Sequence, residues 1–321
     1  MRPRFEVTMS GNGRTMFSHM FEPARLGSLK LANRVKYAAC SVSNFNTHDG
    51  HVTPREYARM EVVAATGAGL ITNQGAYPDS RGEGKAYFRQ ISIADDRYIP
   101  GLAKVADMIH RNGAVAIQQI LHAGRYGGID LPYCAQPSDV PQTLKHFRPP
   151  RAMTVEEIRR CIREHADAAR RAIQADFDGV EITAFMGYLI ANFLSSFTNT
   201  RKDEYGGSLE NRGRFLRETI ESIKSAIDGK PLVVRLNGEE LMDEYGGTPS
   251  GDCIEFMKMA ERAGADCISI VVGWHESRRG ALGRDVPSDH WLPVARRAKA
   301  ALKIPVAFGP RFGSPLLAEK A

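Results

Sequence analysis

Short apolar runs alternate with longer amphipathic stretches along most of this 321-residue chain. The apolar runs are rich in Val, Ile and Ala, and most precede a segment whose apolar residues recur at helical spacing. Parallel strands that are buried on both faces read as unbroken apolar runs, whereas half-exposed strands alternate apolar with polar residues. The pattern therefore predicts repeated βα units built around a parallel sheet.

The count of these units points to a barrel. The predicted strands are seven, at residues 35–39, 69–73, 115–119, 178–183, 232–236, 267–272 and 305–308. The clearest helices are at residues 101–111, 155–175, 211–227, 251–263 and 292–302. Thr154 is placed to cap the second helix, and Ser208 or a neighbour to cap the third. Seven units over about 300 residues fit an α/β fold of the (β/α)8 TIM-barrel type that lacks the eighth βα unit.

Two nucleotide-binding loops that would favour other α/β folds are absent from the sequence. No G-x-G-x-x-G follows a strand, and no G-x-x-x-x-G-K-[ST] occurs. Residues 126–151 are rich in Pro and polar residues and too long for an ordinary βα loop. We expect this segment to form a lid or cover after the third strand.

Charge and cysteine content narrow the classes of function. The 43 Lys and Arg residues against 37 Asp and Glu residues give a net charge of +6, but they are scattered. Scattered charge without a basic stripe disfavours nucleic acid and instead suits an anionic cofactor or substrate. The five cysteines are odd in number and form no C-x-x-C pair. We therefore expect no disulfide framework, no metal site and no 4Fe–4S ligands in this chain.

The sequence gives no sign of a membrane. The basic N-terminus has no apolar h-region behind it, so it does not resemble a signal peptide. No stretch approaches the roughly 18 consecutive apolar residues of a membrane helix. We expect a cytoplasmic protein.

Polar residues at the ends of the predicted strands are the candidates for chemistry. In TIM barrels the active site is assembled at the carboxyl ends of the strands. The first strand ends in Ala38-Ala39-Cys40-Ser41, and the sixth runs into GWHE. Gln119 ends the third strand and Arg235 lies near the end of the fifth.

Three segments resemble one known family. MFEPARLGSLKLANRVKYAAC, AIQQILHAGRY and above all GYLIANFLSSFTNTRKDEYGGSLENRGRF are similar to segments of the old yellow enzyme family. The similarity runs from about Phe17 to the C-terminus. It implies an FMN-binding TIM-barrel oxidoreductase domain over residues 17–321, preceded by an N-terminal extension at residues 1–16.

The resemblance also implies a set of FMN contacts. Arg235 would stabilise the negative charge of a reduced flavin near N1, and Gln119 can offer both a donor and an acceptor to the pyrimidine edge. The other residues are implied by small size or by matching position: Ala38, Ala39, Cys40, Ser41, Gly75 and Arg311, the last as the phosphate arginine.

Departures from the family pattern narrow the subfamily. Short ene-reductases carry a His-x-x-His or His-x-x-Asn pair where this chain has Thr183 and Met186. Tyr188 is retained and His275 stands within GWHE, a combination that looks like bacterial 2,4-dienoyl-CoA reductase and its long enoate-reductase-like relatives. The resemblance implies that Tyr188 donates a proton and His275 assists it. Thr183, Met186 and Trp274 are then expected to contact the substrate.

The end of the chain carries a further expectation. After Arg311 the sequence reads FGSPLLAEKA, where family members continue into an eighth strand, and long members add a cysteine-rich loop for a 4Fe–4S cluster. We expect a C-terminally incomplete barrel, either a truncated product or a chain completed by another polypeptide. The macromolecular partners that the sequence leaves possible are further copies of this chain, in a homo-oligomer, or such a completing polypeptide.

The function predicted is reduction of an activated C=C bond of an α,β-unsaturated acid or acyl-CoA, with FMN as cofactor and NADH or NADPH as reductant. A second hypothesis is an amine dehydrogenase or N-demethylase related to trimethylamine dehydrogenase, which Trp274 and Tyr37 keep open because aromatic rings attract cations. A third is an inactive truncated remnant that binds no cofactor.

Overall fold

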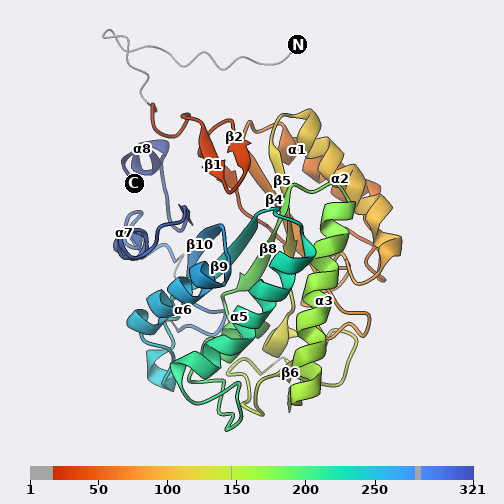
Figure 1. The fold of residues 1–321 in the computed structure, drawn as a ribbon, viewed down its shortest axis with the longest axis vertical. Helices are drawn as coiled ribbons and strands as arrows, with labels where there is room; N and C mark the ends of the chain where they lie inside the picture. The colour runs from red at the N-terminus through yellow and green to blue at the C-terminus, as the bar shows by residue number, and fades with distance from the viewer. Residues whose placement is uncertain (1–16, 146, 279–282) are drawn as a thin grey trace.

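The barrel sheet has seven parallel strands in the order β11-β10-β9-β8-β5-β4-β3 (Figure 1). The computed structural model describes residues 17–145, 147–278 and 283–321, so the predicted extension at residues 1–16 lies outside the described residues. The sheet curls into a nearly closed barrel, which confirms the predicted α/β fold. Its strands are β3 (Lys36–Tyr37), β4 (Leu70–Ala76), β5 (Val115–Ile120), β8 (Gly179–Ala184), β9 (Leu232–Glu239), β10 (Cys267–Val272) and β11 (Val306–Phe308).

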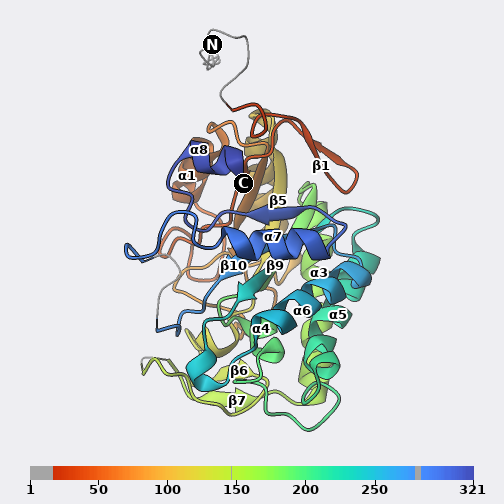
Figure 2. The same cartoon turned by 90° about the vertical axis from the view of Figure 1, so that its left-hand side faces the viewer.

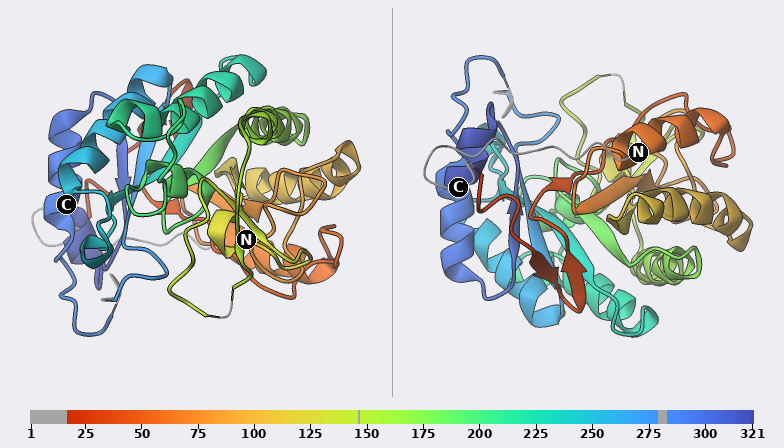
Figure 3. Two further views of the ribbon diagram at one scale, coloured as in Figure 1. Left: turned by 90° about the horizontal axis from the view of Figure 1, so that it is seen from below. Right: turned by 90° about the horizontal axis from the view of Figure 1, so that it is seen from above.

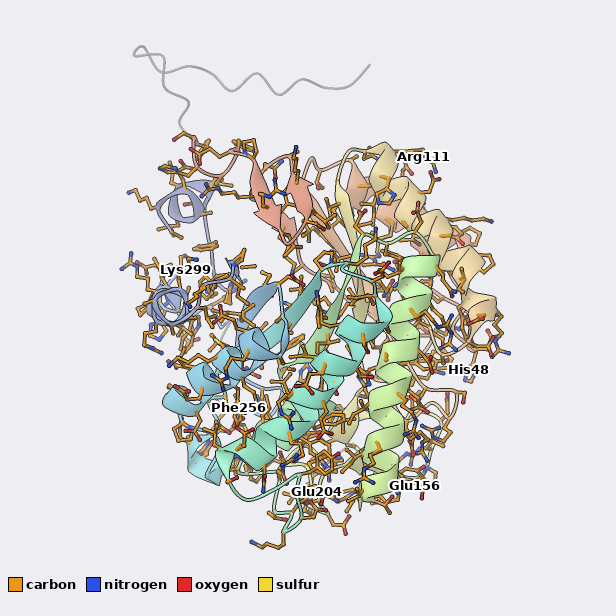
Figure 4. All side chains as sticks on the ribbon, viewed as in Figure 1. His48, Arg111, Glu156, Glu204, Phe256 and Lys299 are labelled. Atoms are coloured by element: carbon orange, nitrogen blue, oxygen red, sulfur yellow. The ribbon has the colours of Figure 1, made fainter. Side chains whose placement is uncertain are left out.

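Helices surround this sheet on its outer side (Figure 3). They are α1 (Pro54–Ala64), α2 (Ile99–Arg111), α3 (Val155–Gln174), α4 (Leu189–Leu194), α5 (Leu209–Ala226), α6 (Ser250–Ala263), α7 (Leu292–Ala301) and α8 (Pro315–Lys320). In Figure 4 the labelled Phe256 of α6 lies on the inner side of its helix and is buried, whereas Arg111, Glu156 and Lys299 are exposed on outer faces.

All seven predicted strands and all five predicted helices are present; β10 has the predicted bounds, and the others differ at one or both ends. The first strand was expected at residues 35–39, but β3 has only two residues, because it is an edge strand and pairs with β4 alone. The second and fifth strands are longer than predicted. α1, α4 and the short strands outside the barrel sheet were not predicted. α1 escaped because much of its sequence, PREYARMEVVA, is polar or charged and shows weak apolar periodicity.

The predicted helix caps are confirmed. The Thr154 side chain accepts a hydrogen bond from the Glu157 N–H, and the Glu157 carboxylate accepts one from the Thr154 N–H, which completes a capping box. Ser208 caps α5 by accepting from the Asn211 N–H at 3.2 Å. These caps determine the residues at which α3 and α5 begin.

An antiparallel hairpin, β1 (Ala24–Leu26) and β2 (Leu29–Leu31), covers one end of the barrel (Figure 2). Leu26 is buried among Leu70, Ile117 and Val233, whose side chains come from three barrel strands. The hairpin therefore seals the amino-terminal ends of the strands, and the opposite end is left for chemistry.

The long segment after β5 has secondary structure of its own. It contains the η2 turn (Gly124–Tyr126) and two short parallel strands, β6 (Cys134–Gln136) and β7 (Pro150–Ala152). Every residue of β6 is buried. The expectation of a cover after the third strand holds for the residues between these strands, two of which line the cavity described below.

The two edge strands of the sheet are β3 and β11, and residues 19–20, which lead toward β1, contact α8 near the C-terminus. The Glu319 carboxylate of α8 accepts hydrogen bonds from the backbone N–H groups of His19 at 2.7 Å and Met20 at 2.9 Å. α8 therefore fastens the segment that leads into β1.

Candidate active site

An ionic network lies inside the barrel, and we call it the floor: Lys36, Gln119, Glu181, Arg235 and Ser269. Glu181 of β8 is fully buried and accepts hydrogen bonds from Lys36 Nζ and, at 2.7 Å, from Gln119 Nε2. Lys36 Nζ also donates to Ser269 Oγ at 3.1 Å. Burial by itself would raise the pKa of Glu181, but the positive charges of Lys36 and Arg235 outweigh it and lower that pKa. Glu181 is therefore an ionised carboxylate in the barrel interior.

Arg235 of β9 still has hydrogen-bonding capacity to offer. Its Nε is buried and has no hydrogen-bond partner within the described part of the chain. Its guanidinium lies 4.5 Å from the centroid of the Phe185 ring and donates weakly, at 3.4 Å, to the Ala39 carbonyl. A buried donor without a partner costs free energy, so an anionic or carbonyl-bearing ligand would be stabilised here.

The predicted glycine of β4 lies against the floor, where neighbouring side chains leave no space for a Cβ. A Cβ on Gly75 would lie 2.7 Å from the Leu121 Cβ and 3.0 Å from the Gln119 Oε1. Because the Gln119 amide nitrogen donates to Glu181, its oxygen is the atom that faces Gly75. A free amide oxygen, an unpaired guanidinium N–H and a backbone without a side chain fit the pyrimidine edge of an isoalloxazine ring.

The remaining predicted cofactor residues are placed as follows. Ala38 and Ala39 follow β3 and are half-buried, whereas Cys40 and Ser41 are exposed. Arg311 follows β11 with a backbone φ of 65° and donates its Nε to the Val286 carbonyl at 3.0 Å. The structure thus links Arg235 with Ala39 and Gln119 with Gly75, while the described contacts of Arg311 are elsewhere. Its role at a phosphate stays a prediction.

A cavity of about 300 Å³ opens at the carboxyl ends of the strands, and we call its lining the mouth. Tyr188 Oη and His275 Nε2 lie 3.3 Å apart in this lining, so the structure brings together the two predicted catalytic residues. The Tyr126 ring meets the His275 ring edge-on, with centroids 5.0 Å apart. The full lining is Ala86, Tyr87, Tyr126, Leu144, Phe147, Tyr188 and His275.

Burial shifts the pKa values of the two predicted catalytic residues. It raises the pKa of Tyr188 to about 12, although the charge of Arg235 opposes the shift. It lowers the pKa of His275, and the charge of Glu276 only partly offsets this. At neutral pH the phenol therefore keeps its proton and the imidazole is neutral, so that either one can donate to or accept from the other.

The predicted substrate contacts lie behind the mouth. Thr183 is buried at the end of β8, and Trp274 packs with Ala191 and Met242 in a small apolar cluster. Met186 has a positive φ of 53° and forms an isolated bridge with Trp274. None of the three predicted residues is in the cavity lining, and their contact with a substrate stays a prediction.

Several residues of the mouth were missed from the sequence. Tyr87, Tyr126 and Phe147 come from loops, where no strand end marks them. Arg125 and Glu276 form a buried ion pair at 2.7 Å, although 151 positions separate them in the chain. Two segments of the sequence carried a signal: HAGRY contains Arg125 and Tyr126, and GWHE contains Glu276.

Across the described ranges, no three His, Cys, Asp or Glu side chains gather in a way that could hold a metal ion. In the same residues, no helix combines the length and apolarity needed to cross a bilayer.

Comparison with known proteins identifies the family. Residues 19–299 match the NADH:flavin oxidoreductase / NADH oxidase family. The chain is 36% identical to a metal reductase of Desulforamulus reducens, over 94% of this chain and 44% of that protein. It is thus similar to less than half of that relative's length.

Solved structures agree. The chain resembles 2-naphthoyl-CoA reductase in complex with 2-naphthoyl-CoA, with a TM-score of 0.90 and 38% identity over 95% of this chain and 48% of that one. It also resembles the old yellow enzyme homologue of Zymomonas mobilis, with a TM-score of 0.78 and 25% identity over 94% and 84% of the two chains. The predicted resemblance to the old yellow enzyme family is confirmed, and the chain belongs to the NADH:flavin oxidoreductase / NADH oxidase family.

Proposed function

We propose that this chain is the FMN-binding domain of an enzyme that reduces an activated C=C bond, with NADH or NADPH as reductant and Tyr188 as proton donor. The observation that carries the proposal is the pairing of the half-buried Tyr188 with the more exposed His275 in the lining of a cavity at the same end of the barrel as the ionic floor. The substrate class is an α,β-unsaturated acid or its CoA thioester. Such a substrate has an alkene carbon that can accept hydride and a neighbour that must then be protonated.

The floor residues would hold the cofactor. Arg235 would donate to the pyrimidine edge of FMN and stabilise the negative charge of the reduced ring. Gln119 would present its amide oxygen, which Glu181 keeps turned toward Gly75. Bound FMN supplies hydride from N5 once a nicotinamide cofactor has reduced it.

The mouth residues would handle the proton. Tyr188 holds a proton on Oη and can deliver it to the substrate carbon next to the one that receives hydride. His275 Nε2, at 3.3 Å, can orient that hydroxyl and return a proton to it after transfer. Because the pKa of Tyr188 is about 12, the donor stays protonated throughout the neutral range.

The lining of the mouth supports a flat, conjugated acyl group. The rings of Tyr87, Tyr126, Phe147 and Tyr188 line a cavity whose size suits such a group. The similar structure of 2-naphthoyl-CoA reductase, bound to a planar aryl thioester, supports the same class. We therefore extend the proposal to aryl-conjugated and dienoyl thioesters.

Amine oxidation is the alternative function, and the charge distribution of the mouth disfavours the binding of a cationic amine. A cationic amine would be held by aromatic faces together with a carboxylate. The aromatic faces are present, but no carboxylate is among the lining residues, and the nearby Glu276 already accepts four hydrogen bonds.

One anaerobic experiment tests the proposal against both rivals. The chain is loaded with FMN, the flavin is reduced, and its reoxidation is followed by visible absorbance after adding an enoyl-CoA, a dienoyl-CoA or an aryl-CoA. The proposal predicts reoxidation by at least one thioester. Reduction of the oxidised flavin by an amine would support the dehydrogenase instead, and failure to bind FMN would support the inactive remnant.

A further inference from the structure

Glu276, at the end of β10, is a buried carboxylate that the proposed chemistry does not use. It accepts hydrogen bonds from Arg125 Nε at 2.7 Å, Arg125 Nη2 at 3.2 Å and Tyr126 Oη at 2.8 Å. The backbone N–H of Thr143 supplies a fourth. Burial by itself would raise the pKa of this carboxyl group, but the charge of Arg125 and the hydrogen bonds from Thr143 and Arg125 outweigh it, and the pKa is lowered. Four donors around one ionised group fix the positions of three separate residues.

The same pair fastens the segment that covers the cavity, residues 141–145 and 147, which we call the cover. Arg125 Nη2 donates to the Pro141 carbonyl at 2.9 Å, and Gln142 Nε2 donates to the Arg125 carbonyl. With the Thr143 bond, three successive cover residues are therefore tied to Arg125 or Glu276.

The cover supplies part of the mouth. Leu144 and Phe147 line the cavity together with Tyr188 and His275, which come from distant parts of the sequence. The centroids of the Phe147 and Tyr126 rings are 5.0 Å apart. Tyr126 in turn meets the His275 ring edge-on. A displacement of Glu276 would therefore move both the cover and the ring that packs against His275.

Local geometry makes the placement of Tyr126 strict. Gly187 has a φ of 84°, and a Cβ there would collide with the Tyr126 hydroxyl and lie 2.7 Å from the Trp274 ring. Tyr126 thus sits against bare backbone, with its hydroxyl on Glu276. Small shifts of this ring have no free space on that side.

We infer that Glu276 is a positioning residue which, together with Arg125, holds the cover and Tyr126 in place and so determines which acyl groups the mouth admits. An apolar pair of similar volume could fill this space equally well, so filling alone does not explain two buried charges. The multiple donors of Arg125 joined to one carboxylate give the fixed geometry that a selective wall requires. The substrate class rests on the proposed function, whereas the fastening of the cover does not.

The test compares Glu276→Gln with a matched control, Glu244→Gln, which removes an exposed carboxylate paired with Arg278. The cover carries one exposed trypsin site, Lys145, whereas the Arg148–Pro149 bond resists trypsin. In the FMN-loaded protein we expect Glu276→Gln to speed cleavage after Lys145 by about tenfold or more, because local opening becomes easier. KM for the acyl substrate should rise by about tenfold while kcat changes by less than about threefold.

A second variant keeps the inference testable if Glu276→Gln folds poorly. Arg125→Leu/Glu276→Leu removes both charges together and leaves none uncompensated. The inference predicts fast cleavage and a raised KM in this variant also, in a chain that still binds FMN. Cleavage and KM at wild-type levels in either folded variant would overturn it. Cleavage and FMN binding are read without turnover, so a failure of the proposed reaction would be recognised separately.

Discussion

The floor and the mouth of the candidate site are built by opposite means. The floor is ionic and carried by barrel strands, and its central carboxylate, Glu181, has a lowered pKa because Lys36 and Arg235 surround it. The mouth is aromatic and carried largely by loops, and its central phenol, Tyr188, has a pKa raised to about 12 because it is buried with little compensating charge. The difference teaches that burial alone favours the protonated, neutral form of an acidic group, whereas burial beside cations favours its ionised form. Binding an anionic ring and delivering a proton require these two settings side by side.

The largest effect should come from breaking the floor. Lys36→Met leaves the fully buried Glu181 without its ion-pair partner, whose side chain is itself only 15% exposed. We expect the free energy of unfolding to fall by about 3–5 kcal/mol, measured by urea denaturation. Lys30→Met, on the exposed face of the β2 hairpin strand, is the control and should change little. A loss below about 1 kcal/mol would mean that the floor behaves like a surface ion pair.

The mouth should respond in rate rather than in stability. Tyr188→Phe removes the proton donor but keeps the ring, so reoxidation of reduced flavin by the acyl substrate should slow by about 10²–10³-fold in stopped-flow measurements. Flavin reduction by NADH or NADPH should be unchanged, since no proton from the phenol is needed there. Tyr245→Phe, an exposed tyrosine, serves as the control. Equal slowing of both half-reactions would contradict the assigned role.

A third buried carboxyl group, that of Glu240, sharpens the comparison, because the charge of Arg212 does not outweigh its burial. Glu240 accepts from Ser195 Oγ at 2.9 Å and from the Thr248 N–H at 2.8 Å, and burial raises its pKa to about 7. The folded chain then holds a proton that the unfolded chain loses above an ordinary carboxyl pKa. This contribution to stability is present at low pH and is lost as pH rises to about 7, by about 3 kcal/mol in all.

Glu240→Gln tests that sign. The variant should lack this fall, so its stability relative to the wild type should improve by about 3 kcal/mol between pH 4.5 and pH 8 in urea titrations. An improvement toward low pH instead would show that Glu240 is ionised like Glu181.

The smallest effect concerns the redox potential. Arg235→Gln removes a charged donor worth about 1.5–3 kcal/mol to the reduced ring, which corresponds to a potential lower by about 30–60 mV. A spectroelectrochemical titration of the FMN-loaded chain measures it. Arg278→Gln, an exposed arginine paired with Glu244, should leave the potential unchanged. An unchanged potential in Arg235→Gln would remove this arginine from the flavin site.

Strand-end reasoning predicted Gln119 and Arg235 of the floor, but it missed Lys36, Glu181 and Ser269 there, as it missed most of the mouth. Gln119, Arg235 and Gly75 stand on buried strands whose apolar runs are visible in the sequence, so their common end of the barrel could be inferred. Tyr87 and Phe147 reach the cavity from separate loops, and only the tertiary fold brings them together. Tyr188 and His275 were recognised by resemblance, which strand-end reasoning could not have distinguished from structural residues.

The element boundaries also divide into those set by local sequence and those set by the tertiary fold. α3 and α5 begin where their caps predict, because a Thr or Ser side chain at that position satisfies the first free N–H groups. β3 is shorter than its apolar run because pairing on one side only leaves Ala38 and Ala39 without ladder partners. Pairing partners are set by the fold, which local pattern does not contain.

The most direct test of the account is a titration of the purified chain with FMN, followed by visible absorbance. The account predicts a saturable, perturbed flavin spectrum at one FMN per chain, which Arg235→Gln weakens and Tyr188→Phe leaves intact. Absence of a saturable change, or binding that is equally insensitive to both substitutions, would contradict a flavin site on the floor beneath the mouth.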